Sequence, residues 1–147
     1  MIANDQRSSK TRYTTAAAAT LVALLLILTG CQRELGGRSL QLVNEARGRH
    51  GLPALSWDDQ AAEKAQKWAE HLANKGSLEH STLSDGMSGW NTLGENVGYH
   101  SNVDNVHQLF LNSPRHRATM LSGAYNAVGI GVVVRDGRYY IVQVYRG

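Results

Sequence analysis

The end of the chain constrains its fold more than any other segment. Residues 128–134 and 139–145 are two runs rich in Val, Ile and Tyr, and Asp136-Gly137 lies in the short polar stretch between them. An Asp-Gly pair between two such runs is typical of a β-hairpin closed by a two-residue type I′ turn. This turn would place Val134 opposite Tyr139 and so set the register of the whole hairpin.

Both faces of this hairpin are apolar. In the expected register, Val132 lies opposite Ile141 on one face. On the other face Val142 lies opposite Gly131, and Gly129 lies on this same face two residues before Gly131. A strand pair that is apolar on both faces must be covered on both, and glycine leaves room for close approach of a neighbouring element. The sequence therefore predicts an α+β fold, a three-layer α-β-α sandwich with an antiparallel central sheet.

Four segments with helical spacing supply the covering layers. Their predicted N-terminal caps are Ser39, Ser56, Asn102 and Ser113. The second is the strongest, because a Ser followed three positions later by an acid is a capping-box signal and Ala repeats at helical spacing up to Gly76. Residues 77–100 then lose all periodicity and predict a long loop, of the kind that carries function.

Residues 1–30 have a different character from the rest. A basic flank precedes an apolar run from Ala16 to Leu28, which is the order of a secretory signal peptide. The run is too short for a transmembrane helix, which needs about 20 apolar residues. It ends in Leu28-Thr29-Gly30-Cys31, which resembles the lipobox of bacterial lipoproteins. The resemblance implies cleavage before Cys31, a diacylglycerol on its thiol and an acylated amino terminus; a plain signal peptide or an uncleaved anchor with a chance cysteine is the alternative.

This leader sets the expected domain organisation and location. We expect a signal peptide over residues 1–30, the lipidated Cys31 and a polar tether over 31–38, and one folded domain over 39–147. Gln32 in place of an Asp resembles lipoproteins that Gram-negative bacteria send to the outer membrane, so we expect a lipid-anchored protein of the bacterial cell envelope. Beyond residue 30 the chain has 12 basic and 11 acidic residues and no cysteine other than Cys31. The sequence therefore predicts no nucleic-acid partner and no disulfide.

Three fragments carry a family resemblance: Glu79-His80-Ser81, Gly94-Glu95-Asn96-Val97 and Ser113-Pro114-Arg115-His116-Arg117. Supporting fragments surround them, namely Leu55-Ser56-Trp57-Asp58, Ala65, Trp68-Ala69, Val128-Gly129-Ile130-Gly131 and Tyr140-Ile141-Val142-Gln143. Together they resemble the CAP superfamily, also called the SCP domain, and particularly its short bacterial members, over about Leu40 to Tyr145. The resemblance implies the same α-β-α sandwich.

The same resemblance implies a cleft that gathers two histidines and an acid, here His80, Glu95 and His116. Residues expected to support this cleft are Ser81, Asn96, Ser113 and Gln143. The second acid of many eukaryotic members would fall near Ser113 and is missing, and Phe110 stands where a Trp is common. A mechanism that needs two carboxylates is therefore not expected.

Two imidazoles and one carboxylate could do three kinds of chemistry. They could bind a divalent metal such as Zn²⁺, act as general base and acid, or hold loops together by hydrogen bonds. The sequence has no His-Glu-x-x-His pair, no Gly-x-Ser-x-Gly elbow and no evident nucleophile, so no catalytic residue is assigned. We therefore expect a binding module for a lipid, an envelope component or a divalent metal; a metal-assisted hydrolase of envelope or peptide substrates and a purely structural or adhesive envelope protein are the alternatives.

Overall fold

The computed structural model describes residue 30 and residues 32–147, of which Glu34–Gly147 form one compact unit. Residues 1–29 of the predicted leader and Cys31 lie outside the described residues. Four strands of the compact unit form one sheet in the order β1-β3-β4-β2. They are β1 (Ser56–Trp57), β2 (Leu93–His100), β3 (Ala127–Arg135) and β4 (Arg138–Arg146). Among the described helices, none has both the length and the apolar content needed to cross a membrane.

The predicted hairpin is confirmed as β3 and β4. Val134 pairs with Tyr139 and Val128 with Tyr145, as the turn requires. Asp136 and Gly137 both have positive φ, 49° and 71°, which is the conformation of a type I′ turn.

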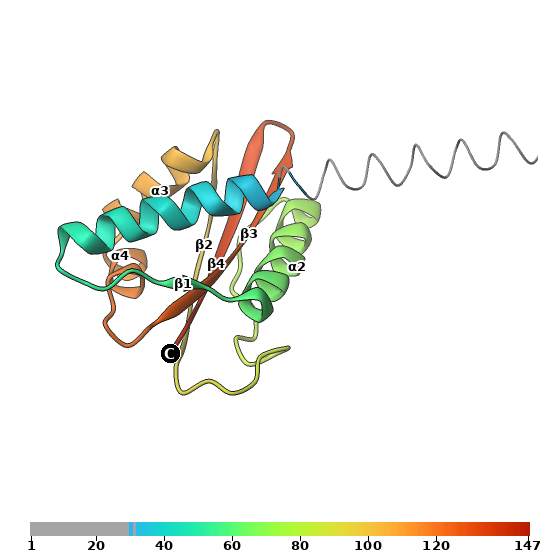
Figure 1. Ribbon diagram of the computed structural model, residues 1–147. Helices are drawn as coiled ribbons and strands as arrows, with labels where there is room; N and C mark the ends of the chain where they lie inside the picture. The colour runs from blue at the N-terminus through green and yellow to red at the C-terminus, as the bar shows by residue number, and fades with distance from the viewer. Residues whose placement is uncertain (1–29, 31) are drawn as a thin grey trace, which may run out of the picture. The chain divides into compact units, whose positions relative to one another are not determined.

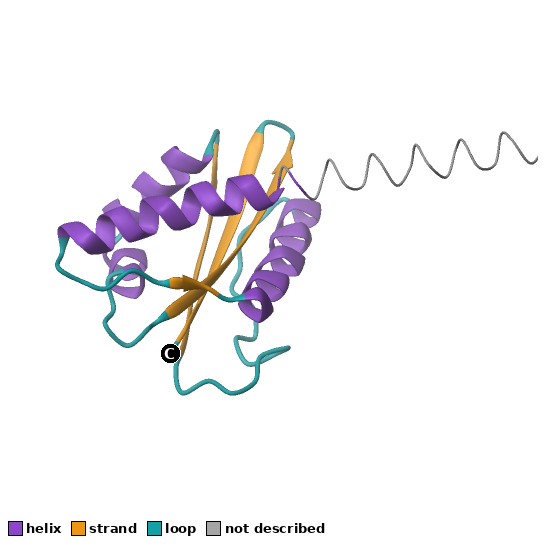
Figure 2. Ribbon diagram, in the orientation of Figure 1, coloured by secondary structure: helices purple, strands orange, loops and turns teal. Residues whose placement is uncertain are grey.

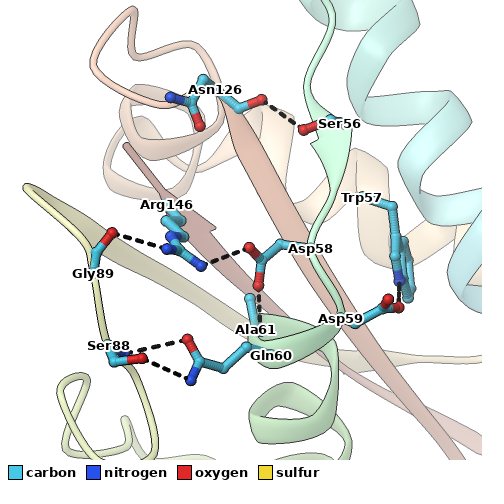
Figure 3. Close-up of polar contacts among 10 residues, drawn as sticks. All are labelled: Ser56, Trp57, Asp58, Asp59, Gln60, Ala61, Ser88, Gly89, Asn126 and Arg146. Carbon is cyan, nitrogen blue, oxygen red and sulfur yellow. Dashed lines mark hydrogen bonds and ion pairs between the residues drawn. The ribbon is translucent and has the colours of Figure 1, made fainter.

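The sheet is mixed, so the prediction of an antiparallel sheet is wrong at one edge. β1 lies parallel to β3, where Ser56 N–H donates to the carbonyl of Asn126 at 3.0 Å. Because Ser56 belongs to a strand, it does not cap the next helix. Asp58 does so instead: its carboxylate accepts from the N–H of Ala61 at 2.7 Å and pairs with Arg146 at 2.8 Å (Figure 3).

Helices cover both faces of the sheet, which confirms the three-layer sandwich. α2 (Asp59–Lys75) lies on the opposite side of the strands from α3 (Val103–Asn112) and α4 (Pro114–Met120) (Figures 1 and 2). The N-terminal helix, residues 32–49, shares a core with α3 and α4. The caps predicted for α3 and α4, Asn102 and Ser113, are confirmed, although the Ser113 side chain makes no capping hydrogen bond.

The glycines of β3 allow α2 to pack close to the sheet. A Cβ atom at Gly129 would overlap the backbone of Ala61 and Ala62, and one at Gly131 would overlap that of Ala65 and Gln66. The expected close approach at these glycines is therefore confirmed, with α2 as the element that makes it.

The N-terminal helix begins earlier than its predicted cap. Residues 32–38, expected to be a tether, are helical, and Leu35 packs against the core. Ser39 lies within this helix, is buried, and its hydroxyl accepts from Gln143 Nε2 at 3.2 Å. The apolar face of the helix thus extends one turn before the Ser that looked like a cap.

The predicted loop over residues 77–100 is also too long, because β2 occupies Leu93–His100. Gly94 and Gly98 made this segment look irregular. In the folded chain they leave space for aromatic rings from other elements: Tyr125 lies over Gly94, and Phe110 lies over Gly98. The Gly-Glu-Asn fragment is therefore on a strand and not in a loop.

Candidate functional site

The candidate site is built around β2, the strand at one end of the sheet order. Glu95 and Asn96 are neighbours on this strand, so their side chains point to opposite faces. Glu95 pairs with Val144, which packs in the α2 core, whereas Asn96 pairs with Gln143, which is buried on the other face. The strand therefore presents one polar side chain to each layer.

Glu95 is a buried carboxylate whose hydrogen bonds all go to the loop before β2. Its side chain is 1% exposed and accepts three hydrogen bonds. They come from His80 Nδ1 at 2.7 Å, Ser81 N–H at 2.9 Å and Ser81 Oγ at 2.6 Å. Burial of a charge is costly unless such donors replace water. Glu95 therefore fastens residues 80 and 81 to the sheet.

His80, the other member of this pair, is exposed where Glu95 is buried. Its side chain is 60% exposed although its Nδ1 is bonded to Glu95. A carboxylate acceptor at Nδ1 assigns the proton of the neutral ring to that nitrogen and leaves Nε2 as an acceptor. The ring is thus held in one tautomer, with Nε2 free to accept a hydrogen bond or a proton from a bound molecule, as in carboxylate-oriented catalytic histidines.

His116 approaches from α4. Its ring is half-buried against Phe110, with ring centroids 5.0 Å apart. Burial lowers the pKa of His116, and the nearby charges of His80 and Arg115 lower it further. The three bonds to Glu95 come from residues 80 and 81, so His116 is not joined to the carboxylate.

Asn96 and Gln143 belong to a buried polar network on the α4 side of the sheet. Asn96 Nδ2 donates to the backbone carbonyl of His116 at 3.1 Å and to Gln143 Oε1 at 3.3 Å. Gln143 Oε1 also accepts from the hydroxyl of Tyr145 at 2.6 Å, and Gln143 Nε2 donates to Ser39. The network ties α4 and the N-terminal helix to β2 and β4, so these residues act by placing the backbone that carries His116.

The sequence prediction of the supporting residues differs from this network in two ways: it missed one member of the network, and it included one residue outside it. Tyr145 is part of it and was missed, because a Tyr in an apolar strand looks like any core aromatic; burial raises its pKa above the ordinary value. Ser113, predicted to support the cleft, begins α4 at its N-cap, and no side-chain bond ties it to the other candidates.

The predicted metal set does not fit the observed arrangement. Within residues 32–147, no group of three or more His, Cys, Asp or Glu side chains could hold a metal ion. Both oxygens of Glu95 already accept hydrogen bonds from His80 or Ser81. A metal at His80, Glu95 and His116 would have to replace these bonds.

A cavity of about 620 Å³ lies between α2 and the loop that carries His80 and Ser81. Its lining residues are Gln60, Glu63, Lys64, Lys67, Trp68, Glu79, His80, Ser81, Thr82, Asp85 and Gly86. Most of these residues were not predicted, because they come from one face of a helix and a loop that meet only in the folded chain. Trp68 was expected in the core, and it is only partly buried.

The loop wall of this cavity is fastened to α2 at regular intervals. Gln60, Lys64 and Trp68 are spaced four residues apart, so they lie on one face of the helix. Trp68 Nε1 donates to the carbonyl of Glu79 at 3.0 Å, and Lys64 Nζ donates to the carbonyls of Thr82 and Asp85 at 2.7 and 3.0 Å. The side chain of Gln60 exchanges two hydrogen bonds with Ser88 (Figure 3). The spacing of these three hydrogen-bonding residues was the sequence signal that could have predicted this wall of the cavity.

Comparisons with known proteins agree on one family. The family model described as "Cysteine-rich secretory protein family", or CAP, matches residues 40–145. The uncharacterized membrane protein YlbC of Bacillus subtilis is 34% identical over 113 residues, which are 69% of this chain and 31% of that protein. The chain thus spans about a third of the length of this curated relative.

Solved structures agree with the fold. An extracellular protein of Bacillus anthracis that contains an SCP domain superposes with a TM-score of 0.70 and 27% identity, over 78% of this chain and 41% of that one. An outer surface protein of Borrelia burgdorferi superposes with a TM-score of 0.67 and 18% identity, over 73% of this chain and 87% of that one.

Proposed function

The chain belongs to the CAP, or cysteine-rich secretory protein, family, and from this premise we propose that it is an extracytoplasmic binding module of the bacterial envelope whose ligand is held at His80. The observation that carries the proposal is the contrast within the His80–Glu95 pair: a 1% exposed carboxylate orients a 60% exposed imidazole. A ring held in this way on the wall of a cavity is prepared to accept a hydrogen bond from a ligand.

The hydrogen bonds of Ser81 favour binding over hydrolysis. A serine nucleophile needs its hydroxyl aligned with the base that takes its proton. The hydroxyl of Ser81 instead donates to Glu95 Oε2 at 2.6 Å, on the far side of the carboxylate from His80. Ser81 therefore orients Glu95, and the outward nitrogen of His80 remains for the ligand.

We further propose that the protein is held at the membrane by lipid on Cys31. The support is the Leu-Thr-Gly-Cys sequence after a basic and apolar leader. Two or three acyl chains give stable anchoring, whereas one gives only marginal binding. Cells grown with a clickable fatty acid should label the wild-type protein and not a Cys31→Ser variant; equal labelling of the two would contradict the anchor.

The binding proposal is tested by purifying the full chain from bacterial membranes in mild detergent and recording native mass spectra. The wild type should carry a bound species that His80→Ala loses. His100→Ala is the matched control, because His100 is an exposed histidine at the end of β2 whose ring bonds only with its neighbour Ser101. A species retained by His80→Ala, or no species on the wild type, would contradict a ligand at His80 and leave a structural or adhesive role.

A further inference from the structure

The cavity beside His80 is lined mainly by residues with charged or hydrogen-bonding side chains. Among its described lining residues are three carboxylates and two ammonium groups, together with Gln, Ser, Thr and His side chains. Trp68 supplies the large apolar surface, and no aliphatic side chain is among the described lining residues. An acyl chain or a sterol would remove water from these charged groups and offer them no hydrogen bonds in its place, which is unfavourable.

From this lining we propose that the ligand is a glycan of the bacterial envelope, bound along α2 between Gln60 and His80. This inference rests on the proposed function and names the chemical class of its ligand. A sugar hydroxyl both donates and accepts, so it can bond to carboxylates on one side and to ammonium or amide groups on the other. His80 Nε2 would accept from one hydroxyl, and the indole of Trp68 offers apolar surface to the C–H groups of a sugar ring.

The cavity is formed before a ligand arrives. Its loop wall is held at Glu79, Thr82 and Asp85 by α2, and at Ser81 by Glu95. Beyond the cavity, Arg146 Nη2 donates to the carbonyl of Gly89 at 2.8 Å and pins the next part of the loop (Figure 3). A site that needs no further ordering binds with a smaller entropy cost. Its volume of about 620 Å³ lies within the range of about 300–1,000 Å³ for small-molecule sites.

Glu63 and Lys67 offer a way to alter the ligand surface without disturbing the loop. They line the cavity from α2 and pair with each other at 2.6 Å, with side chains 69% and 73% exposed. The described hydrogen bonds that fasten the loop come from other residues, namely Gln60, Lys64, Trp68, His71, Lys75, Glu95 and Arg146. Removing both side chains therefore changes the cavity and leaves its walls in place.

The test is co-sedimentation of the full chain, in detergent, with isolated peptidoglycan sacculi, using tubes without sacculi to measure background. We expect the wild type to sediment with the sacculi and to be released by soluble oligomers of N-acetylglucosamine. The double variant Glu63→Ala/Lys67→Ala should bind at least about tenfold more weakly, because two charged hydrogen-bonding groups are lost. Glu70→Ala is the matched control, since Glu70 is an exposed acid of α2 outside the lining.

The outcomes separate this inference from the proposed function. Three results would exclude the glycan: no binding of the wild type to sacculi, equal binding of the wild type and the double variant, or no release of the wild type by the sugar oligomers. A lipid found by native mass spectrometry and lost in the double variant would also overturn the glycan inference. In all of these cases, loss of a bound species in His80→Ala would still support the proposed function. Conversely, glycan binding that survives His80→Ala but not the double substitution would support the glycan and contradict the role of His80.

Discussion

Replacement of Glu95 should separate its organising role from the exposed role of His80. Glu95→Ala removes three hydrogen bonds to a charged acceptor, each contributing about 1.5–3 kcal/mol. Burying the carboxylate itself costs several kcal/mol, which offsets part of that sum, so we expect a net loss of about 2–4 kcal/mol. His80→Ala removes one of these three bonds and leaves the two from Ser81, so it should cost less, about 1.5 kcal/mol, the low end of the range for one bond because the ring is mostly exposed.

A third variant isolates the charge. In Glu95→Gln the amide oxygen can still accept from His80 and from the Ser81 N–H, and the Ser81 hydroxyl can turn to accept from the new amide. The number of bonds is kept while the charge is lost, so we expect a cost of about 1 kcal/mol.

Urea denaturation of the three variants and the wild type, compared at equal m values, measures these differences. In a thermal scan, Glu95→Ala should lower Tm by roughly 8–16 °C, given about 4 °C per kcal/mol for a domain of this size. Equal losses in Glu95→Ala and His80→Ala, or no loss beyond about 0.5 kcal/mol in either, would refute the reasoning that the buried carboxylate organises the loop.

Three further predictions concern the framework. Gly131→Ala should cost about 3 kcal/mol, because its Cβ would overlap the backbone of α2, whereas Gly123→Ala, where nothing lies within 4 Å, should stay within about 0.5 kcal/mol; equal Tm values for the two would contradict the close packing. Tyr145→Phe should cost about 1 kcal/mol in urea denaturation by removing the 2.6 Å bond to Gln143, and an unchanged midpoint would argue against that bond. His107 is buried with both ring nitrogens unpaired among the described residues, and burial, then the charge of Arg49, lowers its pKa below the ordinary 6.5. The unfolded chain therefore takes up a proton that the folded chain does not, so stability should fall as the pH drops below about 6.5, with His116 contributing in the same direction. His107→Leu should flatten this slope when unfolding is compared at about pH 7 and pH 5, and an unaltered slope would show that His107 is not its source.

Features set by local chemistry could be predicted from the sequence. The register of β3 and β4 follows from Asp136-Gly137 and from alternation along the two strands, and all of that information lies within a few residues. The start of α3 at Asn102 is equally local, because the side chain that caps the helix also precedes its apolar pattern.

Features set by contacts between distant segments could not be predicted from the sequence. β1 has two residues, too few for any periodicity, and is a strand because it pairs with β3. Gly94 and Gly98 look like loop residues until Tyr125 and Phe110 are placed over them.

The candidate site divides in the same way. His80 and Glu95 could be chosen from their motifs, and the structure joins them by a hydrogen bond. Which of the two is buried could not be predicted, since it depends on how the loop is held by α2. The polar cavity beside them needs both that helix and that loop, so no single stretch of sequence carries it.

Glu95 fixes the ring of His80 with Nε2 as an outward acceptor. The most direct measurement is two-dimensional ¹H–¹⁵N NMR of the histidine rings at a pH of about 8.5, where imidazoles are neutral. We predict that His80 is the Nδ1–H tautomer in the wild type, that Glu95→Ala releases this preference, and that added sugar oligomers shift the Nε2 signal. An Nε2–H tautomer in the wild type, or a tautomer unchanged by Glu95→Ala, would contradict this role of Glu95.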